Sequence, residues 1–171
     1  AFDKVSKILG LGYPGGPVID RIARRGNPEA VMFPRSYLGK DSLDFSFSGL
    51  KTAVLYHCRG QDLKTTGLRK LPEREVADVA ASFQEAVIDV LVDKLILASR
   101  MYNVRGIQLG GGVAANSRLR FKLEDKSKEI GIPLYCPSLR LCTDNAAMVA
   151  GLAYKMYLEG NVSGLDVEAV T

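Results

Sequence analysis

The chain has 171 residues, of which 47% are hydrophobic, and carries a formal net charge of +4 at pH 7. This size permits a real buried core in one domain, or in one lobe of a larger protein. The mild positive charge permits a polyanionic partner, but no dense run of Lys or Arg requires one. Three cysteines without a Cys-x-x-Cys pair exclude a self-contained disulfide framework and favour a reducing, cytosolic compartment. No uncharged apolar stretch reaches about 18 residues and no leader-like segment opens the chain, so we expect neither a membrane span nor secretion.

The first 26 residues predict two helices joined by a glycine-rich loop. Residues 1–9 place their apolar side chains on one helical face. Because neither an initiator Met nor an N-cap residue precedes them, we expect the chain to begin inside a longer protein. The loop at residues 10–16 reads Gly-Leu-Gly-Tyr-Pro-Gly-Gly, and Pro17 is predicted to take the first position of a helix that runs to Arg25.

The start of this second helix and two nearby acids are candidates for ligand binding. The free N–H groups and the dipole of a helix start attract negative or polar ligand groups. Asp3 and Asp20 carry carboxylates that can accept hydrogen bonds from ribose or amino groups. The alternative is that both are solvated acids or partners of a helix dipole, and the residues alone leave this open.

Residues 27–58 predict a connection, a strand and a helix. Residues 27–40 are irregular and rich in Pro, Gly and charge. Between Leu43 and Phe47, apolar and polar residues alternate, which predicts a half-buried strand, and Ser48 is expected to cap a helix through Cys58. His57, the single histidine, lacks a second ligand at metal-binding spacing, so we expect a surface or hydrogen-bonded residue.

A basic loop and a long helix follow. Residues 59–71 carry four basic side chains, which suit either a solvated loop or a contact with tRNA. From Glu73 to about Tyr102, polar residues recur at steps of three or four and leave most of the helix circumference apolar. We therefore expect this helix to be a largely buried scaffold.

The segment Gln108-Leu109-Gly110-Gly111-Gly112-Val113-Ala114-Ala115-Asn116 is the centre of the sequence. An apolar strand from Val104 to Leu109 is predicted to turn on three glycines into a helix from Ala114 to Lys126. Glycines let a ligand approach the backbone closely, and Asn116 can offer its amide to a ribose or a base. The segment matches neither a dinucleotide fingerprint nor a P-loop, so a tight strand-to-helix turn without a ligand is the alternative.

The last elements predict a second polar helix entry. A short strand at residues 132–136 and a connection at residues 137–141 precede Thr143-Asp144-Asn145, which is expected to open a helix to Glu159. Thr143 is the predicted N-cap. Asp144 would favour the helix dipole, or would hold a metal or a phosphate-bound cation.

Five short motifs occur in order along the chain. They are Tyr13-Pro14-Gly15-Gly16-Pro17, Asp44-Phe45-Ser46-Phe47-Ser48-Gly49-Leu50-Lys51, Ala81-Ser82-Phe83-Gln84, Gly111-Gly112-Val113-Ala114-Ala115-Asn116 and Cys142-Thr143-Asp144-Asn145-Ala146-Ala147-Met148. Together they resemble the C-terminal half of the TsaD family, the tRNA threonylcarbamoyladenosine synthases formerly described as O-sialoglycoprotein endopeptidases. The resemblance runs from residue 1 to about residue 160, and five motifs in this order are far more specific than any one of them.

The resemblance implies an α/β fold of the actin-like and Hsp70-like ATPase (ASKHA) type. Residues 1–160 would supply the C-terminal lobe and interlobe helices of a two-lobed protein, and residues 161–171 a loose tail. The implied reaction transfers threonylcarbamoyl from threonylcarbamoyl-adenylate to the adenosine 3′ of the tRNA anticodon, without a covalent enzyme intermediate. The implied partners are tRNA and companion proteins of the synthesis complex, in the cytoplasm.

The resemblance also assigns site residues by motif. Asp144 would be a catalytic residue and the C-terminal ligand of a divalent metal, iron or zinc. The residues expected to contact an adenine nucleotide or the adenylate are Asp3, Gly16, Asp20, Gly111, Gly112 and Asn116. We therefore expect the bends after Leu109 and before Pro17 to face a common crevice with Asp144.

One departure from the family pattern has consequences for activity. The other metal ligands of the family form a His-x-x-x-His pair in its N-terminal half, and this chain has only His57, in a different motif. We expect this chain alone not to catalyse transfer. Two rival functions are a metal-dependent protease acting on sialoglycoproteins, disfavoured because no His-Glu-x-x-His is present, and a nucleotide-binding assembly module that docks companion proteins.

Overall fold

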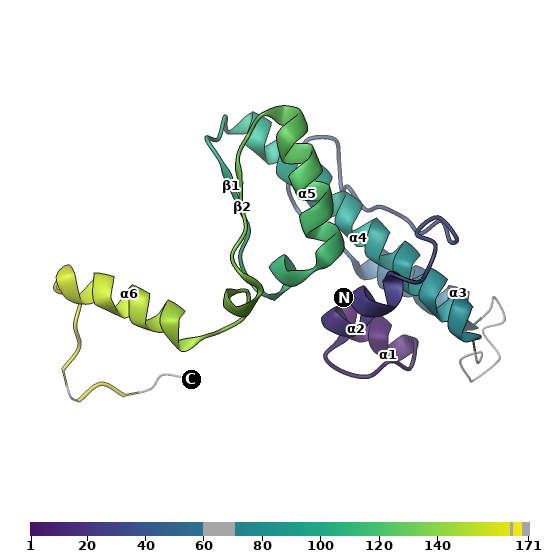
Figure 1. The fold of residues 1–171 in the computed structure, drawn as a ribbon, viewed down its shortest axis with the longest axis horizontal. Coiled ribbons are helices and arrows are strands. Elements are labelled where there is room, and N and C mark those ends of the chain that lie inside the picture. The colour runs from purple at the N-terminus through teal and green to yellow at the C-terminus, as the bar shows by residue number, and fades with distance from the viewer. Residues whose placement is uncertain (60–70, 165, 169–171) are drawn as a thin grey trace.

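Helix α4 (Glu73–Met101) is the spine of the molecule. The computed structural model describes residues 1–59, 71–164 and 166–168. Helices α1, α2 and α3 pack at the N-terminal half of α4, and α5 runs beside its C-terminal half (Figure 1). Residues 60–70 of the basic loop predicted at residues 59–71 lie outside the described residues.

The sequence of α4 explains both its length and its burial. It contains no Gly or Pro, begins after Pro72, and carries Glu73 and Glu75 in its first turn and Arg100 in its last, all of which favour a long helix. Fifteen of its 29 residues are buried. The prediction of a largely buried scaffold helix is therefore confirmed, with its end one residue earlier than expected.

The first core lies between α4 and the helices α1 (Phe2–Ile8), α2 (Gly15–Ala23) and α3 (Ser48–Arg59). Phe83 of α4 is fully buried at its centre, and its ring meets the Phe2 ring edge-on at 5.3 Å between centroids. The predicted first helix is confirmed. The second begins two residues before Pro17, because the Gly15 N–H already has a hydrogen-bond acceptor in Asp3.

The second core lies between α4, α5 (Ser117–Ile130) and a two-stranded parallel sheet of β1 (Ile107–Gln108) and β2 (Leu134–Tyr135). Ile107 pairs with Leu134, so α5 is the crossover of a small β–α–β unit. Both strands are shorter than predicted. Helix α5 runs four residues beyond the predicted Lys126, because it ends at Gly131, which takes the left-handed conformation (φ 69°) that terminates helices.

The strand predicted from Leu43 to Phe47 is wrong: these residues form no strand. Among the described residues, no strand pairs with this segment. It lies over α4 instead, where the ammonium of Lys94 is 5.7 Å from the centroid of the Phe45 ring. The alternation still places Phe45 and Phe47 together, with stacked rings 6.2 Å apart. The same segment passes directly into α3, whose first helical bond runs from the Lys51 N–H to the Phe47 carbonyl, so Ser48 is not its cap.

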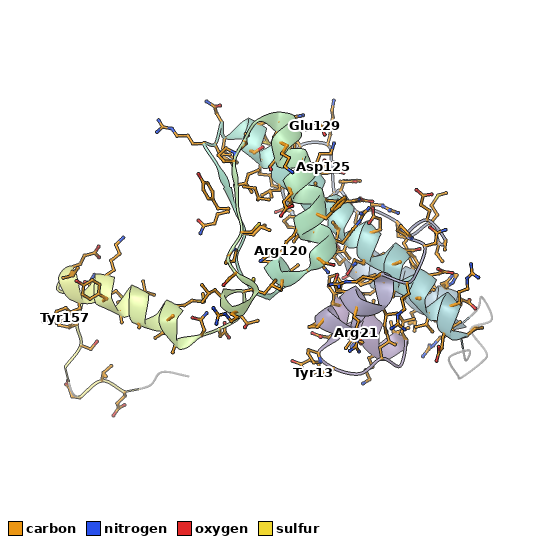
Figure 2. All side chains as sticks on the ribbon, in the orientation of Figure 1. Tyr13, Arg21, Arg120, Asp125, Glu129 and Tyr157 are labelled. Atoms are coloured by element: carbon orange, nitrogen blue, oxygen red, sulfur yellow. The ribbon has the colours of Figure 1, made fainter. Side chains whose placement is uncertain are left out.

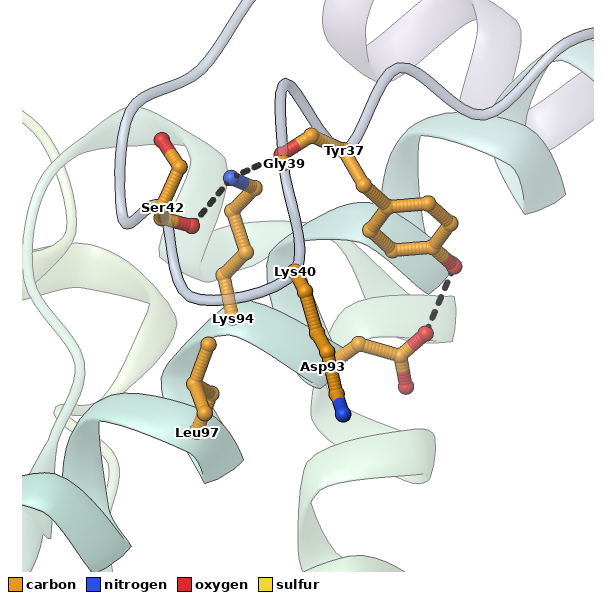
Figure 3. Close-up of a pocket in the computed structure, with 7 residues that line it drawn as sticks. All are labelled: Tyr37, Gly39, Lys40, Ser42, Asp93, Lys94 and Leu97. Carbon is orange, nitrogen blue, oxygen red and sulfur yellow. Dashed lines mark hydrogen bonds between the residues drawn. The ribbon is translucent and has the colours of Figure 1, made fainter.

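Lys94 of α4 holds the irregular segment at residues 37–42 against the helix (Figure 3). It is 3% exposed, and its Nζ donates to the carbonyls of Tyr37 (2.7 Å) and Ser42 (2.5 Å). The Tyr37 hydroxyl donates to Asp93 at 2.6 Å. Burial, followed by this hydrogen bond to a carboxylate, raises the pKa of Tyr37 to about 12. These contacts shape a cavity of about 550 Å³ between the segment and the helix.

A stripe of acids on α4 fastens α5 to it. Glu85 accepts hydrogen bonds from Arg118 at Nε (2.7 Å) and Nη2 (2.8 Å), and Lys122 contacts both Glu85 and Asp89. Burial alone would raise the pKa of Glu85, but the hydrogen bonds from Arg118 and Lys122 outweigh it and lower the pKa to about 2. The charged form of Glu85 therefore stabilises the α4–α5 interface.

This depressed pKa predicts a specific loss of stability in acid. Between about pH 4.5 and about pH 2, the unfolded chain binds a proton at Glu85 and the folded chain does not, so the free energy of unfolding falls as the pH falls through this window. Glu85→Gln should flatten that decline, whereas Glu124→Gln, at an exposed position of α5, should not. Denaturant unfolding from pH 7 to pH 3 measures both, and equal slopes for wild type and Glu85→Gln would contradict the assignment.

Helix α6 (Ala146–Leu158) leads away from the two cores in Figure 1 and has no buried residue. Its N-cap is Asn145, whose side chain accepts from the Met148 N–H at 3.1 Å. The prediction of Thr143 as the cap is wrong, since the helix begins two residues later. Residues 161–164 and 166–168 form neither helix nor strand. In the part of the chain that the structure describes, no helix is both long and apolar enough to cross a membrane.

Candidate functional site

The loop between α1 and α2 is fixed at both ends by side chains of α1. Asp3 Oδ1 accepts the N–H of Gly15 at 2.7 Å, which caps the start of α2. Ser6, fully buried, donates its hydroxyl to the Gly12 carbonyl at 2.6 Å. A Cβ built on Gly15 would lie 2.6 Å from the Asp3 Cα, whereas one on Gly16 would meet nothing within 4 Å. Gly15 thus serves the packing of the loop, and Gly16 faces open space.

Asp20 joins α2 to the start of α5. It is 8% exposed, its Oδ1 accepts the Ser117 hydroxyl at 2.7 Å, and its Oδ2 accepts Arg24 Nη2 at 3.1 Å. Both carboxylate oxygens therefore already have a donor. The link between Asp20 and Ser117 spans 97 residues of sequence and joins α2, which follows the first glycine loop, to the start of α5, which follows the second.

The second glycine turn leads into α5 through a short 3-10 helix, η1 (Gly112–Ala115). Gly111 has φ 81°, a conformation that glycine adopts without strain, and Cβ atoms built on Gly110, Gly111 or Gly112 would meet nothing within 4 Å. The turn thus presents bare backbone to solvent directly before a helix start. The helix itself begins at Ser117, three residues later than predicted from Ala114.

Asn116 is the reason for this later start. Its Oδ1 accepts the N–H of Leu119 at 3.0 Å, which makes it the N-cap of α5. Its Nδ2 donates to Gln84 Oε1 at 2.8 Å, and both amide side chains are buried. One lone pair and one N–H of the amide are therefore used in these two bonds, out of two of each.

Arg120 of α5 links the motif that contains Asp144 to the short helix η1. Its guanidinium donates to the carbonyls of Ala114 (2.5 Å) and Pro137 (2.7 Å), and its Nη2 lies 3.2 Å from the sulfur of Cys142. In Figure 2 it lies where the start of α5 meets the segment that leaves β2. Asp144 follows Cys142 by two residues, so their Cα atoms are within about 7 Å of each other.

Three hydrogen bonds link the start of α5 to segments that carry predicted site residues, and the common crevice with Asp144 stays a prediction. Hydrogen bonds connect this helix start to α2 through Asp20, to α4 through Gln84 and to the Cys142 motif through Arg120. The sequence analysis assigned no role to Gln84, Ser117 or Arg120. Gln84 lies in a motif already noted, but nothing in the sequence indicates its partner.

Asp144 is exposed and supplies one carboxylate, two residues after the Cys142 that Arg120 contacts. Among the described residues, no group of three or more His, Cys, Asp or Glu side chains is arranged to hold a metal ion. His57 belongs elsewhere: its Nε2 lies 3.9 Å from Glu75 Oε1, and its ring meets that of Phe33 edge-on. The residues present therefore do not make a complete metal site by themselves.

The two glycines of the first loop give a paired prediction. Gly15→Ala should destabilise the protein by about 1–3 kcal/mol, because its Cβ would overlap the backbone of Asp3. Gly16→Ala has room and should leave the melting temperature nearly unchanged, yet weaken binding of an adenine nucleotide roughly tenfold if a ligand fills that space. Thermal melts with and without nucleotide test both, and unaltered nucleotide affinity in Gly16→Ala would remove this residue from the site.

Comparison with known proteins extends this picture along the whole chain. The profile of the TsaD family, described as tRNA N6-adenosine threonylcarbamoyltransferase, matches residues 1–151. The protein of that name from Moorella thermoacetica is 50% identical over 175 residues, covering 99% of this chain and 48% of the relative. Those from Thermotoga neapolitana and Clostridioides difficile are 50% and 48% identical, covering 94% and 99% of this chain and 46% and 48% of the relatives.

The chain spans about half the length of these curated relatives, and the matched part is their C-terminal half. The family profile covers all five sequence motifs and ends within α6, at residue 151. The chain therefore belongs to the TsaD family of tRNA N6-adenosine threonylcarbamoyltransferases.

Proposed function

We propose that the protein containing this chain transfers a threonylcarbamoyl group from threonylcarbamoyl-adenylate to an adenosine of tRNA, next to the anticodon. The observation that carries this proposal is the hydrogen bond between Asp20 of α2 and Ser117 at the start of α5, two helices whose starts each lie at a glycine-rich bend. Helix starts with bare glycine backbone beside them suit the phosphate and ribose of an adenylate. The relatives that share this chain's sequence bear the name of that enzyme.

The architecture we infer for the whole protein is the two-lobed ASKHA fold, of which residues 1–160 form one lobe with interlobe helices. The small parallel sheet crossed over by α5 and the helical cover along α4 are compatible with such a lobe. The exposed apolar face of α6 suits a helix that packs against the other lobe. Companion proteins of the synthesis complex and a cytoplasmic location are part of the same proposal.

The nucleotide-binding roles follow from the placement of each residue. Gly16, Gly111 and Gly112 would admit the adenylate close to the backbone at the two helix starts. Asp20 and Asn116, both held in fixed orientation by the fold, would use their remaining hydrogen-bonding capacity on its ribose or base. Asp3, exposed and fixed by the Gly15 N–H, would contact the ligand from the opposite side of the loop.

Asp144 would act at the reacting end of the adenylate. As an exposed carboxylate two residues from Cys142, it fits one position of a divalent metal site, iron or zinc, whose remaining ligands would come from the N-terminal half. A bound divalent metal supplies Lewis-acid stabilisation of negative oxygen. The chain's own residues would hold the adenylate in one orientation, so that the amine of tRNA attacks the carbamoyl carbon and AMP leaves.

Reconstitution tests the proposal. This chain, expressed with the N-terminal half of a curated relative, should convert unmodified tRNA and threonylcarbamoyl-adenylate to modified tRNA and AMP, detected by mass spectrometry of the nucleosides. The chain alone should give no product, because it holds one wall of the nucleotide site and one carboxylate of the metal site. Product from the chain alone, or none from the combined halves, would contradict the proposal.

The rival functions have less support. A zinc protease needs three protein ligands and a general base, and the described residues contain no such group. The relatives carry the name of a transferase rather than a protease. A pure assembly module would not need open glycine backbone at two helix starts.

A further inference from the structure

An exposed tyrosine stands at the edge of the candidate nucleotide site. Tyr13 is 84% exposed and points outward from the loop between α1 and α2 (Figure 2). The residues on either side of it are held by hydrogen bonds: the Gly12 carbonyl by Ser6, and the Gly15 N–H by Asp3. The Leu11 N–H also donates to the Ser6 carbonyl at 2.9 Å. The fold thus presents an aromatic ring to solvent on a well-anchored loop, which lowers the entropy lost when a ligand stacks on it.

Two lysines lie on the same side of the molecule as this ring. A cavity of about 540 Å³ is lined by Tyr13, Gly10, Gly12 and three residues of α1: Asp3, Lys4 and Lys7. Lys4 and Lys7 are exposed, are one helical turn apart, and form no ion pair with any residue in the described ranges. Asp3 is the one acid in the lining, and one of its oxygens already accepts the Gly15 N–H. The cavity therefore combines an exposed ring with two unpaired cations.

This combination fits an unpaired nucleotide better than it fits other ligands. Every base offers a flat face that stacks on an aromatic ring, and flanking phosphates attract ammonium groups. An apolar peptide would leave both lysines without a counter-charge, and a free phosphate would not use the ring. Asp3 of α1 lines this cavity and also accepts the N–H of Gly15, the neighbour of Gly16, so a base stacked on Tyr13 would lie beside the predicted adenylate.

We propose that Tyr13, Lys4 and Lys7 form an RNA-binding surface that stacks an unpaired base of the substrate tRNA and binds its neighbouring phosphates. This inference rests on the proposed function and names the surface through which the RNA is held near the site. The partner is single-stranded RNA in a loop, because paired bases offer no free face for stacking.

Binding of a tRNA anticodon stem-loop to the protein, with this chain joined to the N-terminal half, tests the role of the ring. Fluorescence anisotropy should show that Tyr13→Ala weakens binding by roughly 5- to 100-fold, and that Tyr13→Phe keeps nearly all of the affinity. Tyr102→Ala, which removes a 70% exposed tyrosine just after α4, is the matched control and should bind as wild type does. A fully paired RNA hairpin stem should not respond to Tyr13→Ala.

The two lysines are tested separately, by how RNA affinity depends on salt concentration. The double variant Lys4→Gln with Lys7→Gln should reduce the slope of log affinity against log salt by about 1.4, since each phosphate contact on single-stranded RNA contributes about 0.7. The variant Lys128→Gln with Lys155→Gln removes the same charge elsewhere and should leave the slope unchanged. An equal slope in both double variants would overturn the assignment of the lysines.

The outcomes separate this inference from the proposed function. If Tyr13→Ala binds the stem-loop as wild type does while wild type modifies tRNA, the surface is wrong and the function stands. If Tyr13→Ala loses RNA binding but wild type gives no modified tRNA, the surface stands and the function fails. If Tyr13→Ala lowers the melting temperature and leaves RNA affinity unchanged, the ring packs within the protein and the RNA surface is overturned.

Discussion

Asp144→Ala should lower the kcat/KM of threonylcarbamoyl transfer by at least about a hundredfold in the protein with both halves present. The exposed carboxylate lies two residues from Cys142, which Arg120 links to the Ala114 carbonyl, and the described residues contain no group of three or more His, Cys, Asp or Glu that could hold the metal instead. The effect should appear in kcat more than in nucleotide affinity, since we propose that the glycine bends make the adenylate contacts.

The matched control for this variant is Asp125→Ala, which removes an exposed acid of α5 away from the helix start. It should leave turnover and bound metal unchanged, whereas Asp144→Ala should also lower the metal content measured by elemental analysis. Full activity in Asp144→Ala, or an equal loss in both variants, would remove Asp144 from the reacting centre.

Phe83→Ala should reduce the free energy of unfolding by about 3–5 kcal/mol. Phe83 is fully buried in the core between α4 and the first three helices, and its ring meets that of Phe2. Removing it leaves a cavity in the core that also contains Ile19 of α2, the helix whose first turn carries Gly16, so nucleotide affinity should fall together with stability. Denaturant unfolding and nucleotide titration measure the two effects.

Phe121→Ala is the control for that prediction, because Phe121 is 62% exposed on α5. It should change stability by less than about 1 kcal/mol, since little apolar surface is buried there. Comparable losses from the two substitutions would mean that the α4 core is not the principal source of stability.

How far the sequence predicts this fold depends on whether a signal is local. The composition and periodicity of α4 suffice for its length and burial, because a helix without Gly or Pro needs no distant partner to form. Gly131 is likewise a local signal, since a glycine after a helical stretch indicates the end of the helix, here α5. The strand predicted at residues 43–47 failed because alternation predicts an extended backbone but cannot supply a neighbouring strand, and here Lys94 holds the segment instead.

The candidate site was predictable residue by residue but not as an arrangement. The glycine turns and acids stand out in the sequence, yet the bonds that gather them join residues far apart, such as Asn116 with Gln84 and Ser117 with Asp20. Helix caps were ambiguous for the same reason: Thr143 and Asn145 are both good caps, and the local geometry selected Asn145. No rule of spacing predicts such tertiary hydrogen bonds.

In the proposed site, the two glycine bends at the starts of α2 and α5 face one adenine nucleotide. Glycine-selective ¹⁵N labelling of the protein with both halves present, followed by titration with AMP, is the sharpest test of this arrangement. The amide signals of Gly16, Gly111 and Gly112 should shift together with a single dissociation constant, while that of Gly131, at the far end of α5, should stay in place. Shifts confined to one bend, or shifts at neither, would contradict it.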